Sequence, residues 1–304
     1  MKRTALLTAI AILTITTSMQ AWAGPSSLRY SISVTKFENE ASWRGKWDLG
    51  NGFTTIMTDV LNETDQFIVL GDAEMRNAAL AEQDFAASGR TAGGRLAPQT
   101  GRMTPAQLLV RGSITHVQET AGGRGGLNFR GISVGGSRAS AEVNITIYLV
   151  ETVTGQVKAS QKVTGRSGKR GVGVGYYGSR LGGLTGNLSG FTDDNVGQAV
   201  ENAVSEAVSF LIAQLDEIPW EAAVVMVRDG QVIINRGSRD GISQGMLFRV
   251  GQAEQLIDPD TGELLDSFMK TIADIEVSEV RDRVAYCRVL SGQGVDKGMT
   301  VLPK

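Results

Sequence analysis

The sequence predicts an α+β protein: an N-terminal α/β sandwich with a mostly antiparallel sheet and two Gly-rich β-hairpin insertions, followed by a small β-barrel domain. Three observations lead to this prediction. Residues 139–150 alternate between apolar and polar side chains over twelve positions, as a half-buried strand does. Residues 196–215 repeat apolar side chains at helical spacing. After Pro219, short strand-like runs alternate with turn sequences, which favours a small closed barrel.

The N-terminus has the composition of a secretory signal peptide, residues 1–23. Lys2 and Arg3 precede an apolar stretch at 5–15, and Ala21-Trp22-Ala23 supplies the small residues of a cleavage site. The alternative is an uncleaved anchor, but the stretch is shorter than the roughly 20 residues that a membrane-spanning helix needs. Gly24 rather than cysteine follows the expected cleavage point, so we expect no lipoprotein anchor.

The N-terminal unit, residues 24–218, begins with a strand in which Tyr30, Ile32 and Val34 share one face. Asp72 is placed to cap the second of its two early helices, whose apolar stripe is modest. Thr154-Gly155 supplies a turn after the long strand, and Pro219 ends the last helix. The elements expected here are a strand at 28–37, a helix at 51–62, a strand at 66–70, a helix after Asp72, a loop at 88–101, strands at 108–117, 139–150 and 156–164, and a helix at 196–215.

The C-terminal unit, residues 221–304, has the spacing of short strands joined by tight turns. Asp229-Gly230 is a strong hairpin signal, and Asp258-Pro259-Asp260-Thr261-Gly262 is a second turn sequence. The strands are expected at 222–227, 231–235, 246–250, 272–280 and 283–290. Helices should cover only one side of the preceding sheet.

Composition argues against an enzyme. The 304 residues include one histidine, His116, and one cysteine, Cys287. A single histidine excludes a multi-histidine metal site and makes histidine-based triads hard to assemble. The segment 173–178 matches G-x-G-x-x-G without a following helix, and Asp258, Asp260 and Glu263 fit a turn better than a calcium loop. We expect no catalytic residues, no metal and no cofactor.

Glycine and positive charge are concentrated in residues 121–190. This window holds 18 of the 38 glycines and has a net charge of +7, whereas the rest of the mature chain has −11. Its two Gly-rich insertions, 121–138 and 165–192, alternate in places as membrane β-hairpins do. Flexible surface loops are the alternative, and nucleic acid is an improbable ligand for an exported chain. The candidate membrane-facing residues are Leu127, Phe129, Val172, Val174, Tyr176, Leu184 and Leu188.

Several blocks resemble the bacterial curli secretion channel and holdfast-attachment family (CsgG/HfaB). They are 108–114 (Leu-Leu-Val-Arg-Gly-Ser-Ile), the strand and turn at 145–155, the helix 196–215 and the segment 63–70. The resemblance covers about residues 28–217. Separately, 224–302 resembles the C-terminal domain of the flagellar assembly protein T through 235–241 and 258–262.

The first resemblance implies a protein of the periplasm or outer membrane that forms a homo-oligomeric ring and has a secreted or envelope protein as its partner. Members that form channels contribute two β-hairpins per subunit to a shared outer-membrane barrel and export an unfolded subunit without ATP. The family's constriction lies in the loop after the first strand, here about 38–50. The resemblance therefore makes this loop a candidate pore or interaction site, with Trp43, Arg44, Lys46 and Trp47 as its residues.

Two departures from the family pattern keep a second interpretation open. The lipoprotein cysteine is absent, and the insertions are rich in glycine with few aromatic residues. The alternative is a soluble periplasmic accessory protein that docks an envelope partner or an anionic cell-wall polymer without forming a pore.

Overall fold

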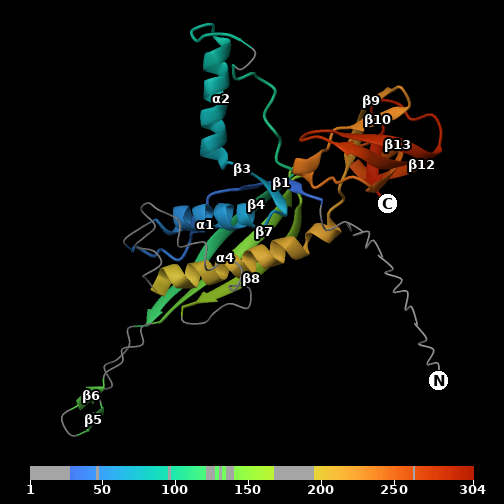
Figure 1. Cartoon of the computed structure of the whole chain (residues 1–304). Helices are drawn as coiled ribbons and strands as arrows, with labels where there is room; N and C mark the ends of the chain where they lie inside the picture. Colours follow the sequence, from blue (N-terminus) through green and yellow to red (C-terminus); the bar gives the residue numbers. More distant parts are fainter. Residues whose placement is uncertain are drawn as a thin grey trace, which may run out of the picture.

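The computed structural model describes residues 28–45, 48–94, 97–120, 127–129, 132–134, 140–167, 195–262 and 264–304. Figure 1 shows a twisted sheet crossed by two long helices, a third helix that stands away from the sheet, and a separate barrel of strands. The α+β class predicted from the sequence is confirmed, as is the closed barrel.

The sheet is mixed: most of its residue pairs are antiparallel, as expected, and the first strand adds parallel pairs that the sequence did not predict. Its order is β3-β1-β4-β7-β8, with β2 beside β4. The first strand, β1, pairs in parallel with both β3 and β4, whereas β4, β7 and β8 pair antiparallel. The reason is that a helix follows β1 and another follows β3, and such crossovers return the chain in the same direction. The strands are β1 (Tyr30–Val34), β2 (Glu38–Asn39), β3 (Phe67–Leu70), β4 (Leu108–Thr120), β7 (Ser140–Glu151) and β8 (Val157–Arg166).

Helices α1 (Leu49–Glu63) and α4 (Asn195–Ala213) cover one face of this sheet, as predicted. The buried face of α4 consists largely of valine and alanine, so the helix can lie close to β7 and β8. At Gly165 the approach is so close that a Cβ atom would meet the Ala199 carbonyl oxygen at 1.8 Å. Small residues on both elements therefore fix this layer.

Helix α2 (Ala73–Ala87) has the Asp72 cap that the sequence predicts: Met75 N–H donates to Asp72 Oδ1 at 2.9 Å. The expected apolar stripe, however, covers nothing, because none of the fifteen residues is buried. Figure 1 shows α2 projecting away from the sheet. Its Arg76 Nη1 donates to the Thr104 carbonyl at 3.1 Å, which ties the helix to the chain that returns to β4.

The barrel closes in the order β10-β13-β12-β11-β14-β9, all by antiparallel pairs. Strands β11 and β12 extend far beyond their predicted bounds, and β14 was not among the expected strands. The strands are β9 (Ala222–Arg228), β10 (Gln231–Ile234), β11 (Leu247–Ile257), β12 (Leu264–Val280), β13 (Ala285–Gly292) and β14 (Thr300–Pro303).

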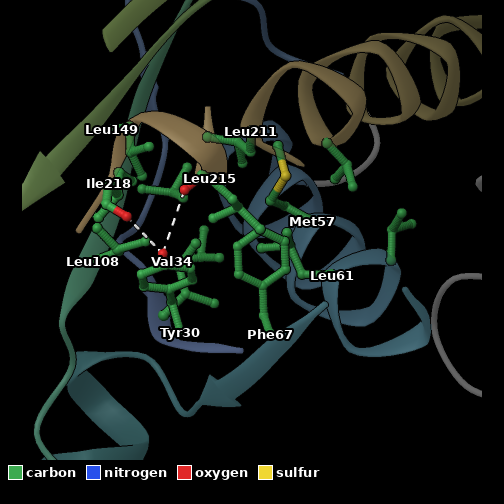
Figure 2. Packing of buried hydrophobic residues seen from close by; sticks show 14 of the residues in the cluster. Tyr30, Val34, Met57, Leu61, Phe67, Leu108, Leu149, Leu211, Leu215 and Ile218 are labelled. Carbon is green, nitrogen blue, oxygen red and sulfur yellow. Dashed lines mark hydrogen bonds between the residues drawn. The ribbon is translucent and has the colours of Figure 1, made fainter. Parts of the chain in front are cut away.

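The sheet and the barrel share one hydrophobic core through the connection after α4. The Tyr30 hydroxyl donates to the Ile218 carbonyl at 2.6 Å and lies 3.4 Å from that of Leu215 (Figure 2). Trp220 stacks on Phe248 of the barrel, with ring centroids 5.6 Å apart. The Arg29 N–H also donates to the Asp240 carbonyl at 2.9 Å.

Part of the first Gly-rich insertion is described: β5 (Leu127–Phe129) pairs antiparallel with β6 (Ile132–Val134). The candidate membrane-facing residues Val172, Val174, Tyr176, Leu184 and Leu188 lie outside the described residues. The membrane-hairpin interpretation therefore stays a prediction. Among the described helices, none has the length and apolar character needed to cross a bilayer.

Candidate functional site: a hollow at the start of helix α1

A hollow of about 590 Å³ opens where β1 continues into the loop before α1. Its lining combines apolar side chains in the floor with charged and polar ones at the rim. The lining residues are Lys36, Phe37, Glu38, Asn39, Trp43, Asp48, Leu49 and Gly50. All of these residues except Lys36 and Phe37 lie in the 38–50 segment that the resemblance makes a candidate pore or interaction loop.

Phe37 anchors the floor. It is 1% exposed and stacks on Phe53 of α1, with ring centroids 5.3 Å apart. The Phe37 N–H donates to Thr54 Oγ1 at 3.1 Å, so the loop is tied to the helix as well as packed on it. Close packing leaves no room beside Phe37: a Cβ atom on Gly112 would meet its ring at 2.2 Å, and one on Gly50 would meet its carbonyl oxygen at 2.3 Å.

Two ion pairs of balanced charge involve rim residues, and the second reaches Arg111 beside the hollow. Lys36 Nζ lies 3.7 Å from Asp48 Oδ2, and Arg111 Nη2 lies 2.6 Å from Glu38 Oε1. All four side chains are more than half exposed, so these pairs contribute little to stability and can exchange partners with a ligand. Asp48 also caps α1, because its Oδ1 accepts a hydrogen bond from the Asn51 N–H at 2.8 Å.

The loop itself is held against the sheet by backbone contacts. Residues 38 and 39 pair in parallel with 113 and 114 of β4, and the Ala41 N–H donates to the Ile114 carbonyl at 2.9 Å. Asn39 Nδ2 donates to the Trp43 carbonyl at 2.9 Å, which closes the turn. The wall of the hollow is therefore built by the sheet edge and is not a free loop.

The four predicted loop residues have different outcomes. Trp43 lines the hollow, half-buried against the hydrophobic core. Arg44 is exposed and is not among the lining residues. Lys46 and Trp47 lie outside the described residues. Sequence reasoning missed Phe37 and Gly112, although an isolated glycine inside a strand pattern signals a close approach.

The hollow can place an apolar or aromatic side chain against half-buried Trp43 while its charged and polar rim contacts polar backbone. Among the described residues, no group of histidine, cysteine and carboxylate side chains could hold a metal ion. Cys287 is buried in the barrel, and this burial raises the pKa of its thiol to about 12, so it is unreactive.

A match to a family model identifies the family of the protein that contains this hollow. The model of the family described as "Curli production assembly/transport component CsgG" matches residues 15–246, most of the chain. The chain belongs to the CsgG family. The description of CsgG is that of a transport and assembly component, and it names no catalytic activity.

Solved structures also match this chain, at low identity and low TM-score. The PelC L103M dodecamer from Paraburkholderia phytofirmans is 13% identical, with a TM-score of 0.32, 60% of this chain covered and 88% of that one. The hypothetical protein CT253 from Chlamydia trachomatis is 13% identical, with a TM-score of 0.36 and coverage of 62% and 99%. Lipoprotein GNA1162 from Neisseria meningitidis is 16% identical, with a TM-score of 0.25 and coverage of 62% and 99%.

A comparison with curated proteins found no match. The CsgG match ends at residue 246, so most of the barrel lies beyond it. The likeness of the barrel to the flagellar assembly protein T stays a prediction from the sequence.

Proposed function

We propose that this protein is a non-enzymatic subunit of an oligomeric outer-membrane complex that exports or assembles a surface fibre or adhesin. The observation that carries the proposal is the CsgG family match over residues 15–246. The protein would act in the periplasm or outer membrane after loss of residues 1–23. Its mechanism would be confinement and diffusion of an unfolded client through a pore, without a cofactor.

The hollow supports a role in guiding an extended client. Half-buried Trp43 offers an aromatic contact above the buried Phe37 and Leu49, and the ion pairs beside it are exposed and weak. Such a surface holds side chains briefly without strong affinity, which a diffusing chain requires. Each subunit of a ring would contribute one hollow.

Helix α2 supports the oligomer. An isolated helix of fifteen residues is marginal in water, yet α2 buries none of its side chains and leaves Met75 62% exposed. Packing against another subunit would supply the contacts that the helix lacks. In the same proposal, the insertions 121–138 and 165–192 would form the membrane hairpins.

The test replaces residues 168–190 by a glycine-serine segment of equal length and compares the variant with the wild-type protein. The measurements are cell fractionation, the size of the detergent-extracted species and ion conductance in a planar bilayer. We expect the wild type to form a large conducting ring in the outer-membrane fraction, and the variant to lose both insertion and conductance.

A matched control replaces 91–94, in the exposed loop after α2, by serine, and should behave as the wild type. A wild-type protein that stays a monomer or dimer in the soluble periplasmic fraction would overturn the channel. That result would favour the soluble accessory protein that docks an envelope partner or an anionic cell-wall polymer.

A further inference from the structure

The hairpin of β11 and β12 extends beyond the closed barrel. Pairing of β12 with β13 ends at Ala273, and pairing of β11 with β14 ends at Gly251. Residues 252–257 and 264–270 therefore pair only with each other in the part of the chain that the structure describes. We call residues 252–270 the arm. Each arm strand has an outer edge, which offers backbone N–H and C=O groups to an added strand.

The two outer edges of the arm differ in how well they can accept another strand. The pairing with β11 skips Ile272 and Leu265, so both extra residues of the hairpin lie on β12. The lysine of the arm, Lys270, is on β12 as well. Bulges and lysines are features that keep a strand edge from pairing. Residues 252–257 of β11 contain no extra residue, lysine, proline or glycine, so the edge of β11 is the open one.

The long edge strand of the sheet is protected, in contrast to the edge of β11. Strand β8 lies at the end of the sheet and pairs only with β7 among the described strands. Along its length it has three exposed cationic side chains, those of Lys158, Lys162 and Arg166. Charged side chains on an edge strand oppose pairing with another chain. A basic segment in particular would be repelled by β8 but not by β11.

Large apolar side chains lie beside the open edge. Leu256, Ile257, Leu265 and Phe268 are each between 51% and 56% exposed. Glu254 lies opposite Phe268, and Leu256 follows Glu254 by two positions, so these three side chains share one face of the hairpin. A two-stranded hairpin is marginally stable in water on its own. A third strand that covers the apolar side chains would therefore stabilise the arm.

The negative charge of the arm is not neutralised by its own subunit. The arm contains five acidic side chains and one lysine, which gives a net charge of −4. Inside the barrel, the carboxylates of the same strand β12 each pair with a lysine or an arginine; they are Asp274, Glu276 and Glu279. Glu254 of the arm has no cationic partner among the described residues. A partner of the arm should therefore supply positive charge.

We propose that the arm binds an extended, basic polypeptide segment as an added strand along residues 252–257 of β11. Backbone hydrogen bonds to the open edge would give affinity, and alternate side chains of the segment would give specificity. On the face of Glu254 and Leu256, a basic and an apolar side chain two residues apart would match. The edge of six residues is about 20 Å long. That the segment belongs to the exported client rests on the proposed function, whereas the binding site itself does not.

Charge disfavours other occupants of this edge. The arm of a second copy has the same net charge of −4, so the pairing of two arms would be repelled. An anionic lipid surface would be repelled for the same reason. A neutral or acidic segment could form the same backbone hydrogen bonds but would lack the electrostatic attraction. The extended basic segment satisfies both the open edge and the charge.

The test measures binding of a fluorescein-labelled peptide, Lys-Val-Val-Thr-Lys-Thr-Lys, to the full mature chain by fluorescence anisotropy. Two matched peptides separate the two parts of the proposal. In the first, glutamate replaces every lysine, which reverses the charge. In the second, every backbone amide is N-methylated, which keeps the side chains and removes the N–H donors. We expect the parent peptide to bind saturably and at least tenfold more tightly than either matched peptide.

Variants of the protein locate the binding site. Glu254→Lys should weaken binding of the parent peptide at least tenfold. Glu82→Lys makes the same change of charge at an exposed position of α2 and should leave binding unchanged. A benzophenone group on the peptide should cross-link to residues 252–257 under ultraviolet light, as mass spectrometry of the digested product would show.

Three results would overturn this inference and leave the proposed export function standing. They are no binding of the parent peptide, equal binding of the N-methylated or the glutamate peptide, and cross-links confined to β8 or to the outer edge of β12. A wild-type protein that stays monomeric in the soluble periplasmic fraction but binds the parent peptide would have the opposite meaning. It would overturn the export function and support the binding site on the arm.

Discussion

At the scale of single residues, Tyr30 joins the first strand of the sheet to the connection that leads into the barrel. Its hydroxyl donates to the Ile218 carbonyl at 2.6 Å, and the side chain is 5% exposed. Tyr30→Phe leaves the packing and removes a buried hydrogen bond, so it should lower the free energy of unfolding by about 1–2 kcal/mol. Urea denaturation measures the loss. Tyr148→Phe, on a partly exposed side chain, should cost less than about 0.5 kcal/mol.

The same residue makes stability depend on alkaline pH. Burial, with a smaller contribution from Asp216, raises the pKa of Tyr30 from 10.0 to about 12. The folded phenol therefore keeps its proton in a pH range where the unfolded phenol loses it. Its contribution to stability is complete below pH 10 and is lost as the pH rises towards 12. The Tyr30→Phe variant should lose stability less steeply over this range, and equal slopes would contradict the assignment.

Gly112 is the residue on which the floor of the hollow depends. A Cβ atom there would meet the buried Phe37 ring at 2.2 Å, and the stacked Phe53 blocks its retreat. Gly112→Ala should destabilise the fold by about 1–3 kcal/mol through overpacking, as a shift in the thermal unfolding midpoint would show. Gly93→Ala is the matched control, because a Cβ atom at Gly93 meets nothing within 4 Å. If both variants unfold at the same temperature, the close contact does not exist.

The family resemblance pointed to the loop at 38–50, where the structure has a hollow, but it did not point to the residues that build the hollow; a function for this loop stays a prediction. Trp43 was expected and lines the hollow, because an aromatic residue in a polar loop stands out in the sequence. Phe37 was not expected, since it looks like the last residue of an ordinary strand. Its role depends on the parallel contact of residues 38–39 with β4, a long-range pairing that side-chain periodicity does not encode.

Among whole elements, helix α2 forms as its own sequence predicts, although none of its side chains is buried. Its cap and its alanine-rich composition are enough to predict a helix, and the helix is present. No described part of the subunit buries its side chains, so we expect its persistence to depend on assembly. Amide hydrogen exchange should be fast in α2 of a monomeric form and at least tenfold slower in the oligomer. Helix α4, buried along one face, serves as the internal reference and should be protected in both forms.

The sequence patterns predicted neither the parallel pairing of β1 nor the full length of β11 and β12. Alternation shows that 30–34 is a strand, but it is the same for parallel and antiparallel neighbours. Strands β11 and β12 were predicted too short, because Gln252 and Lys270 lie opposite each other and interrupt the apolar pattern. The barrel was predicted correctly, since Asp229 and Gly230 both adopt the positive φ that their tight turn demands.

At the scale of the whole molecule, Trp220 couples the sheet to the barrel. It is 4% exposed, stacks on Phe248, and belongs to a hydrophobic core that runs through both parts. Trp220→Ala should cost about 3–5 kcal/mol and split a single calorimetric unfolding transition into two. Trp220→Phe should cost much less, because the indole N–H is buried and makes no hydrogen bond within the described residues. A single transition in both variants would show that the two parts do not depend on Trp220.

The close contact of β8 with α4 has a consequence for how this chain tolerates change. The Arg166 carbonyl accepts from Asn202 Nδ2 at 2.8 Å, and Gly165 touches Ala199, so β8 ends beside the first turns of α4. The connection from β8 to α4 therefore begins and ends at two points that are held close together. For a connection whose two ends are held in this way, doubling the length costs only about 0.6 kcal/mol of closure entropy. The folded block therefore tolerates changes of length between residues 167 and 195, so any selection on that segment acts through the proposed membrane contact and not through the stability of the block.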